Sequence, residues 1–180
     1  RFSMLEREDP DNYKEKVQQL VIGDSRVRPL RHNYCGPKDR CTTIPGAKIR
    51  DVEVALKEEL GRVVPDRIVV QVGVNNIGPR CSVSLRKEYY SLLQRLRETR
   101  KPVLVTGVLP RLGETTEWYS RAMSVNQYVR GQCESMGLGY LDLWDEFMDN
   151  RRFFRWDGLH LSDVGAQRLG GAYRTLFQGN

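Results

Sequence analysis

Short apolar or β-branched runs recur along the chain, and most stop abruptly at glycine or at a polar residue. The clearest is Arg67–Val72, which ends at Gly73 as expected of a strand buried on both faces of a parallel sheet. By the same reasoning we predict strands at residues 18–22, 42–44, 103–108 and 139–143.

Apolar residues between these runs recur at helical spacing. The residues Ile49, Val52, Leu56 and Leu60 mark a helix that packs one face inward. We predict helices at residues 26–32, 49–60, 84–96 and 118–136, and a last one that runs towards Phe177. Strands and helices alternate throughout, which indicates a three-layer α/β fold around a parallel sheet.

The 180 residues contain no internal repeat and no linker, so we expect one domain at residues 17–180 after a polar arm at residues 1–16. Apolar residues make up 39% and charged residues 29%, which is typical of a soluble globular protein. No run is long enough to span a membrane, and the polar start is not a signal peptide. We therefore expect an intracellular, cytoplasmic protein with reduced thiols.

Two of the four cysteines, Cys35 and Cys41, lie near His32. Five residues separate the two cysteines, which is wider than the usual zinc knuckle, so an ordinary loop is the better interpretation. We expect neither a metal ion nor a cofactor.

The formal net charge is +6, which favours anionic partners without indicating a fold. Arginines gather in three clusters: Arg26, Arg28 and Arg31; Arg95, Arg97 and Arg100; and Arg151, Arg152 and Arg155. Solvated surface is the common explanation of such clusters. A footprint for RNA or another anionic surface requires that the clusters share one face.

The first strand delivers the tripeptide Gly23-Asp24-Ser25 to a predicted strand-to-helix turn. A serine at a helix start lies among unpaired N–H groups that favour negative charge, which suits a nucleophile. The same position also suits an ordinary helix cap. Which of the two alternatives applies depends on whether other residues of the chain supply catalytic partners for Ser25.

A serine nucleophile needs a base, and the chain has only two histidines. His32 is seven residues from Ser25 on the predicted helix, which is beyond contact, so His160 is the candidate. Asp157 precedes it by three residues and could orient the imidazole across a glycine turn. The alternative is an Asp-Gly turn followed by a structural histidine.

Oxyanion donors could come from the Ser25 N–H, the Gly46 N–H and the Asn75 side-chain amide, each at the end of a predicted strand. Singly, a turn glycine and a loop asparagine are commoner explanations. Because ligands bind beyond the carboxyl ends of parallel strands, we expect these groups to meet Asp157 and His160 at one edge of the sheet.

The blocks Gly23-Asp24-Ser25, Gly46, Gly73-x-Asn75 and Asp157-x-x-His160, in this order, resemble the SGNH (GDSL-type) hydrolase superfamily. The resemblance implies a flavodoxin-like α/β/α domain that hydrolyses esters without a cofactor. It further implies Ser25 as nucleophile, His160 as base, Asp157 as its partner, and an oxyanion hole of Ser25, Gly46 and Asn75.

More narrowly, residues 21–28, 45–47 and 153–162 resemble the esterase domain in the first open reading frame protein of CR1/L2-type non-LTR retrotransposons. Two departures from the superfamily pattern stand out. Its third block usually continues with aspartate, whereas this chain has Asn76, which puts the rigidity of that loop in question. The residue after the serine is often aliphatic, and we expect the side chain of Arg26 to face solvent or an anionic substrate.

These patterns lead us to expect a serine esterase that acts on acetyl or lipid-like acyl esters, with membrane lipid as one source of substrate. The main alternative is a binding module that keeps the hydrolase fold and docks RNA, anionic lipid or a protein partner through its arginines. A third interpretation is a sugar O-acetylesterase. The sequence favours an enzyme because every member of the triad is present.

Overall fold

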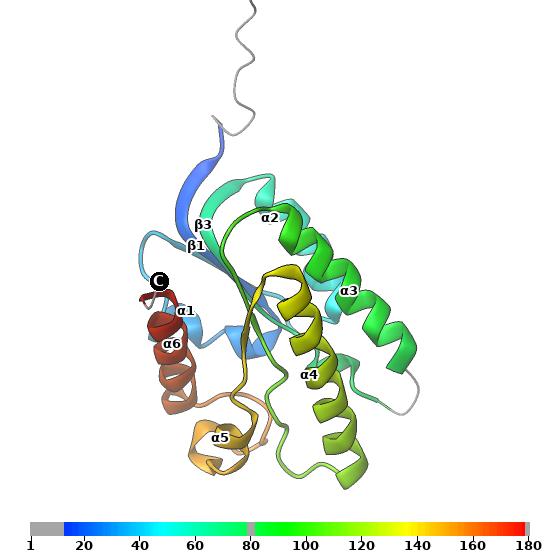
Figure 1. The fold of residues 1–180 in the computed structure, drawn as a ribbon. Coiled ribbons are helices and arrows are strands. Elements are labelled where there is room, and N and C mark those ends of the chain that lie inside the picture. The colour runs from blue at the N-terminus through cyan, green and yellow to red at the C-terminus, as the bar shows by residue number, and fades with distance from the viewer. Residues whose placement is uncertain (1–12, 79–81, 179–180) are drawn as a thin grey trace, which may run out of the picture.

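A computed structural model describes residues 13–78 and 82–178, built on one sheet of five parallel strands (Figure 1). The strands are β1 (Glu15–Gly23), β2 (Asp39–Thr43), β3 (Val63–Gln71), β4 (Val103–Thr106) and β5 (Gly139–Leu141). Their spatial order is β2-β1-β3-β4-β5, which is the flavodoxin-like arrangement. Most of the expected N-terminal arm, and Cys81, lie outside the described residues.

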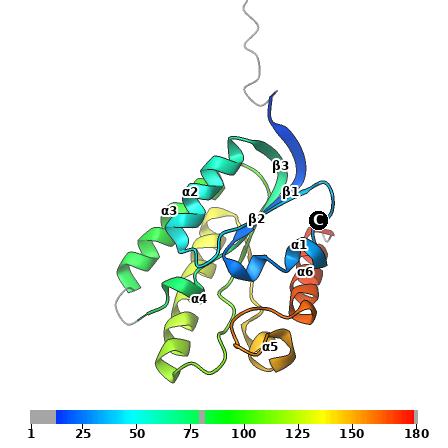
Figure 2. The same cartoon turned by 180° about the vertical axis from the view of Figure 1, so that it is seen from behind.

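Helices cover both faces of the sheet. They are α1 (Leu30–Asn33), α2 (Ile49–Leu60), α3 (Ser82–Glu98), α4 (Thr116–Met136), α5 (Trp144–Met148) and α6 (Asp163–Gln178). Helices α2, α3 and α4 lie on one face of the sheet, and α1, α5 and α6 lie on the other (Figures 1 and 2). One apolar core lies under each group of helices. The three-layer α/β prediction is therefore confirmed. None of the helices in the described ranges is long and apolar enough to cross a bilayer.

The helix expected at residues 26–32 is wrong in detail. A 3-10 helix, η1 (Ser25–Val27), is followed by the short α1, and Pro29 stands between them as the N-cap of α1. Strand β4 ends at Thr106, two residues before its predicted end, and β5 likewise ends at Leu141. Strands β2 and β3 begin earlier than predicted, because backbone pairing with β1 extends them through polar residues and Pro65.

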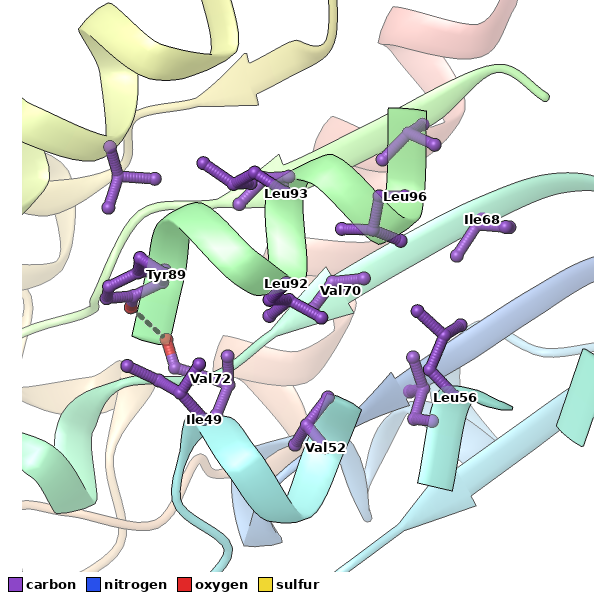
Figure 3. Packing of buried hydrophobic residues seen from close by; sticks show 14 of the residues in the cluster. Ile49, Val52, Leu56, Ile68, Val70, Val72, Tyr89, Leu92, Leu93 and Leu96 are labelled. Carbon is purple, nitrogen blue, oxygen red and sulfur yellow. Dashed lines mark hydrogen bonds between the residues drawn. The ribbon is translucent and has the colours of Figure 1, made fainter. Parts of the chain in front are cut away.

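Gly73 follows β3, and Tyr89 packs tightly against it. The Tyr89 hydroxyl donates a hydrogen bond of 2.7 Å to the carbonyl oxygen of Val72 (Figure 3). Gly73 has φ +122°, and a Cβ at this position would collide with the Tyr89 hydroxyl. Only glycine fits here, and the backbone then enters the 3-10 helix η2 (Val74–Asn76).

Gly73→Ala is expected to lower the free energy of unfolding by about 2 kcal/mol or more, because it combines backbone strain with a buried clash. Urea unfolding of the two chains measures the difference. Gly131→Ala is the matched control, since Gly131 lies inside α4 with open space around it and alanine favours helix. Equal loss of stability in both variants would contradict this account.

Candidate active site

Ser25 begins η1 at the carboxyl end of β1. The close approach of β1 to β3 requires Gly23, because a Cβ there would collide with the carbonyl oxygen of Gln71. That carbonyl accepts a hydrogen bond of 3.2 Å from the N–H of Asp24. The strand end therefore holds the turn at Ser25 directly against the neighbouring strand.

Asp24, and not Ser25, caps η1. Its Oδ1 accepts a hydrogen bond of 3.0 Å from the N–H of Arg26. The hydroxyl of Ser25 makes no hydrogen bond with any described residue, so the capping alternative does not account for this serine.

Gly46 lies in the loop that follows β2, and Asn75 lies in the 3-10 helix η2 that follows β3. The Asn75 side-chain amide donates a hydrogen bond of 3.0 Å to the carbonyl oxygen of Ala47, which joins the two segments. Within the described ranges, the N–H groups of Ser25 and Gly46 donate to no protein acceptor, and one amide hydrogen of Asn75 is also unused. These donors are available to a bound anion.

Asp157 and His160 form one hydrogen-bonded turn. Oδ2 of Asp157 lies 2.5 Å from Nδ1 of His160. Oδ1 of Asp157 accepts backbone hydrogen bonds of 2.9 Å from Leu159 and His160. Burial opposes ionisation of Asp157, but these hydrogen bonds outweigh it and lower its pKa to about 2. The turn therefore holds an ionised carboxylate against the imidazole.

The Asp157–His160 turn lies within electrostatic range of both neighbours of Ser25. Burial raises the pKa of Asp24, while the charge and the backbone N–H of Arg26 and, to a smaller extent, the nearby His160 act in the opposite direction. Burial lowers the pKa of Arg26 to about 10, and Asp24 and Asp157 oppose that effect. No hydrogen bond joins Ser25 to His160 among the described residues. His32 lies exposed in α1.

The two residues that depart from the superfamily pattern, Arg26 and Asn76, both make defined contacts inside the protein. Arg26 is fully buried, so the expectation that it faces solvent or an anionic substrate is wrong. Asn76 accepts a hydrogen bond of 3.1 Å from the N–H of Ile49 and donates one of 3.2 Å to Glu88. An aspartate could not make the second bond, because a carboxylate has no N–H to donate.

Sequence reasoning missed the loop between β4 and α4. The N–H of Leu112 donates a hydrogen bond of 2.9 Å to the carbonyl oxygen of Gly158, inside the Asp157–His160 turn. In the sequence, only the turn residues after the predicted strand at residues 103–108 indicate this loop. They do not indicate that the loop contacts Gly158, which is distant in the chain.

A model of the GDSL-like lipase/acylhydrolase family matches residues 23–168. Among solved structures, the esterase domain of the ZfL2-1 ORF1 protein from the zebrafish ZfL2-1 retrotransposon is 30% identical. That match covers 89% of this chain and 98% of the zebrafish domain, with a TM-score of 0.51.

Two bacterial structures share the fold at lower identity. A lipase/acylhydrolase from Enterococcus faecalis is 18% identical over 92% of this chain and 96% of its own, with a TM-score of 0.68. An acetylxylan esterase from Geobacillus stearothermophilus is 16% identical over 88% and 92%, with a TM-score of 0.67. No curated protein matches the chain.

Proposed function

Because the chain belongs to the GDSL-like lipase/acylhydrolase family, we propose that it is a serine esterase with Ser25 as its nucleophile. The observation that carries the proposal is the set of unused donors after the carboxyl ends of β1, β2 and β3: the N–H of Ser25, the N–H of Gly46 and the amide of Asn75. A site built to hold an oxyanion needs such donors preorganised and free of protein acceptors.

In the proposed reaction His160 takes the proton from the Ser25 hydroxyl, which attacks the ester carbonyl. The three donors stabilise the oxyanion that forms, and His160 passes its proton to the leaving alcohol. Water activated by His160 then hydrolyses the acyl-enzyme. Asp157 stabilises the imidazolium through its hydrogen bond to Nδ1 and fixes the tautomer that can accept the serine proton.

The similarity to the zebrafish domain supports a narrower assignment. Because it reaches 30% identity over almost the whole of that domain, we propose that this chain is the esterase domain of a retrotransposon ORF1 protein. Its substrates are then acetyl or lipid-like acyl esters.

Hydrolysis of p-nitrophenyl esters, from acetyl to long acyl chains, tests the esterase assignment. We expect turnover, together with stoichiometric labelling of Ser25 by a fluorophosphonate that is located by peptide mass spectrometry. The chain-length profile separates an acetylesterase from a lipid-directed enzyme. No turnover on any ester and no labelling of Ser25 would overturn the proposal.

One surface feature favours an anionic lipid surface as the source of substrate. Trp156, next to Asp157, is 90% exposed, and three exposed arginines precede it: Arg151, Arg152 and Arg155. The Arg151 guanidinium donates to the carbonyl oxygens of Arg155 and Trp156. An indole among cationic side chains is suited to the interface of an anionic bilayer.

Trp156→Ser is therefore expected to weaken binding to phosphatidylserine-containing vesicles by about tenfold, because an interfacial tryptophan is lost. Vesicle co-sedimentation measures the change. Met123→Ser is the control, since Met123 is an exposed apolar side chain on α4. Equal binding by both variants would exclude this surface, and salt-sensitive RNA binding without vesicle binding would favour the alternative of a nucleic-acid module.

A further inference from the structure

Arg26 is a charged side chain enclosed entirely by protein, directly after Ser25. Its guanidinium donates two hydrogen bonds to consecutive carbonyl oxygens, one of 2.5 Å to Leu109 and one of 2.8 Å to Pro110. A buried charge is costly unless it is paired and hydrogen-bonded, so a surface role does not explain this arginine. Its two contacts tie the Ser25 turn to the loop after β4.

The loop after β4 also holds the histidine turn. The N–H of Leu112 donates to the carbonyl oxygen of Gly158 over 2.9 Å. The contact is close, because a Cβ at Gly158 would lie 3.0 Å from the Cβ and the carbonyl oxygen of Leu112. The loop that receives Arg26 therefore contacts the turn carrying Asp157 and His160, only two residues after Pro110.

The electrostatic interactions of Arg26 with two carboxylates, Asp24 and Asp157, also support a link between the two turns. Asp24 is 1% exposed, and no hydrogen bond reaches its Oδ2 from any described residue. The positive charge of Arg26 opposes the rise in the pKa of Asp24 that burial causes. Arg26 also interacts favourably with Asp157. One guanidinium thus lies within electrostatic range of a carboxylate beside Ser25 and of the carboxylate that binds His160.

We propose that Arg26 is a positioning residue for ester hydrolysis, which couples the Ser25 turn through the loop after β4 to the turn of Asp157 and His160. The proposal rests on the function proposed above for Ser25 and His160. Proton transfer requires these two side chains to come within hydrogen-bond reach, and a misplacement of about 1 Å can cost about 100-fold in rate. Arg26 fixes their separation without touching the substrate.

Kinetics of Arg26→Met and Arg26→Lys on p-nitrophenyl acetate test the coupling. Methionine keeps the length without charge or donors, and lysine keeps the charge but lacks the planar fork that reaches two carbonyls. We expect kcat to fall about 10- to 100-fold in both variants, with KM within about twofold. Arg28→Met is the matched control, because Arg28 is exposed and directly follows the same 3-10 helix as its C-cap; it should leave kcat unchanged.

Amide hydrogen exchange provides a readout that does not depend on catalysis. We expect exchange of the Leu112 N–H to accelerate at least about tenfold in Arg26→Lys, while the amides of Val69 and Val70 in β3 keep their protection. If Arg26→Met loses protection throughout β3, it is unfolded and Arg26→Lys decides the question.

Full kcat in Arg26→Lys would overturn the proposal, as would a rise in KM alone or an unchanged rate of Leu112 exchange. Absence of turnover in the parent chain would instead overturn the esterase function. In that case accelerated Leu112 exchange would still establish that Arg26 joins the two turns, and unchanged exchange would refute it.

Discussion

Ser25→Ala is expected to abolish ester hydrolysis, with a fall in kcat of about 10⁴-fold or more, because the reaction loses its nucleophile. The change should leave the fold intact, since the Ser25 hydroxyl makes no hydrogen bond with the described residues. Steady-state hydrolysis of p-nitrophenyl acetate measures the first effect, and thermal unfolding measures the second.

Ser120→Ala is the matched control, because Ser120 is an exposed serine on α4. It should retain full activity and full labelling by fluorophosphonate. Turnover in Ser25→Ala equal to that of the parent chain would show that hydrolysis does not depend on this serine. If neither chain exceeds the uncatalysed rate of hydrolysis, the alternative of a binding domain that keeps the hydrolase fold is favoured.

Asp157→Asn is expected to lower kcat by about 10⁴-fold while leaving KM nearly unchanged. The amide can keep the two backbone hydrogen bonds that Oδ1 accepts from Leu159 and His160. In place of Oδ2, however, it presents an N–H to Nδ1 of His160, and this favours the tautomer that cannot accept the serine proton at Nε2. Steady-state kinetics at pH 8 measure the loss.

The pH dependence of the free energy of unfolding should distinguish the carboxylate of Asp157 from carboxylates whose pKa is not depressed. Because the folded-state pKa of Asp157 is depressed to about 2, its contribution is fully present above about pH 4 and is lost as the pH falls towards 2. Urea unfolding should therefore show a gap between the parent chain and Asp157→Asn that is constant above pH 4 and narrows below it.

Asp149→Asn is the control for this experiment, because Asp149 is an exposed aspartate at the end of α5. It should show neither the loss of activity nor the gap in stability at any pH. A gap between parent and Asp157→Asn that widens as the pH falls would contradict the depressed pKa.

Local pattern was sufficient for most of the fold. The apolar runs placed every strand of the sheet, and the spacing of Ile49, Val52 and Leu56 predicted α2 with its observed bounds. The spacing of apolar residues did not predict the shortest helices. The helix α5 and the 3-10 helix η3 (Arg151–Phe153) were not predicted, because three to five residues are too few to show a period.

The sequence by itself determined the family blocks, the order of the strands along the chain and the candidate residues at their carboxyl ends. Only the tertiary structure decided the environment of each side chain. Arg26 reads as surface charge in the sequence, yet it is buried because Leu109 and Pro110 offer it two carbonyl oxygens. Likewise, Asp24 rather than Ser25 caps η1. The burial and hydrogen bonding of Arg26 depend on carbonyl groups far away in the chain, which local sequence patterns do not reveal.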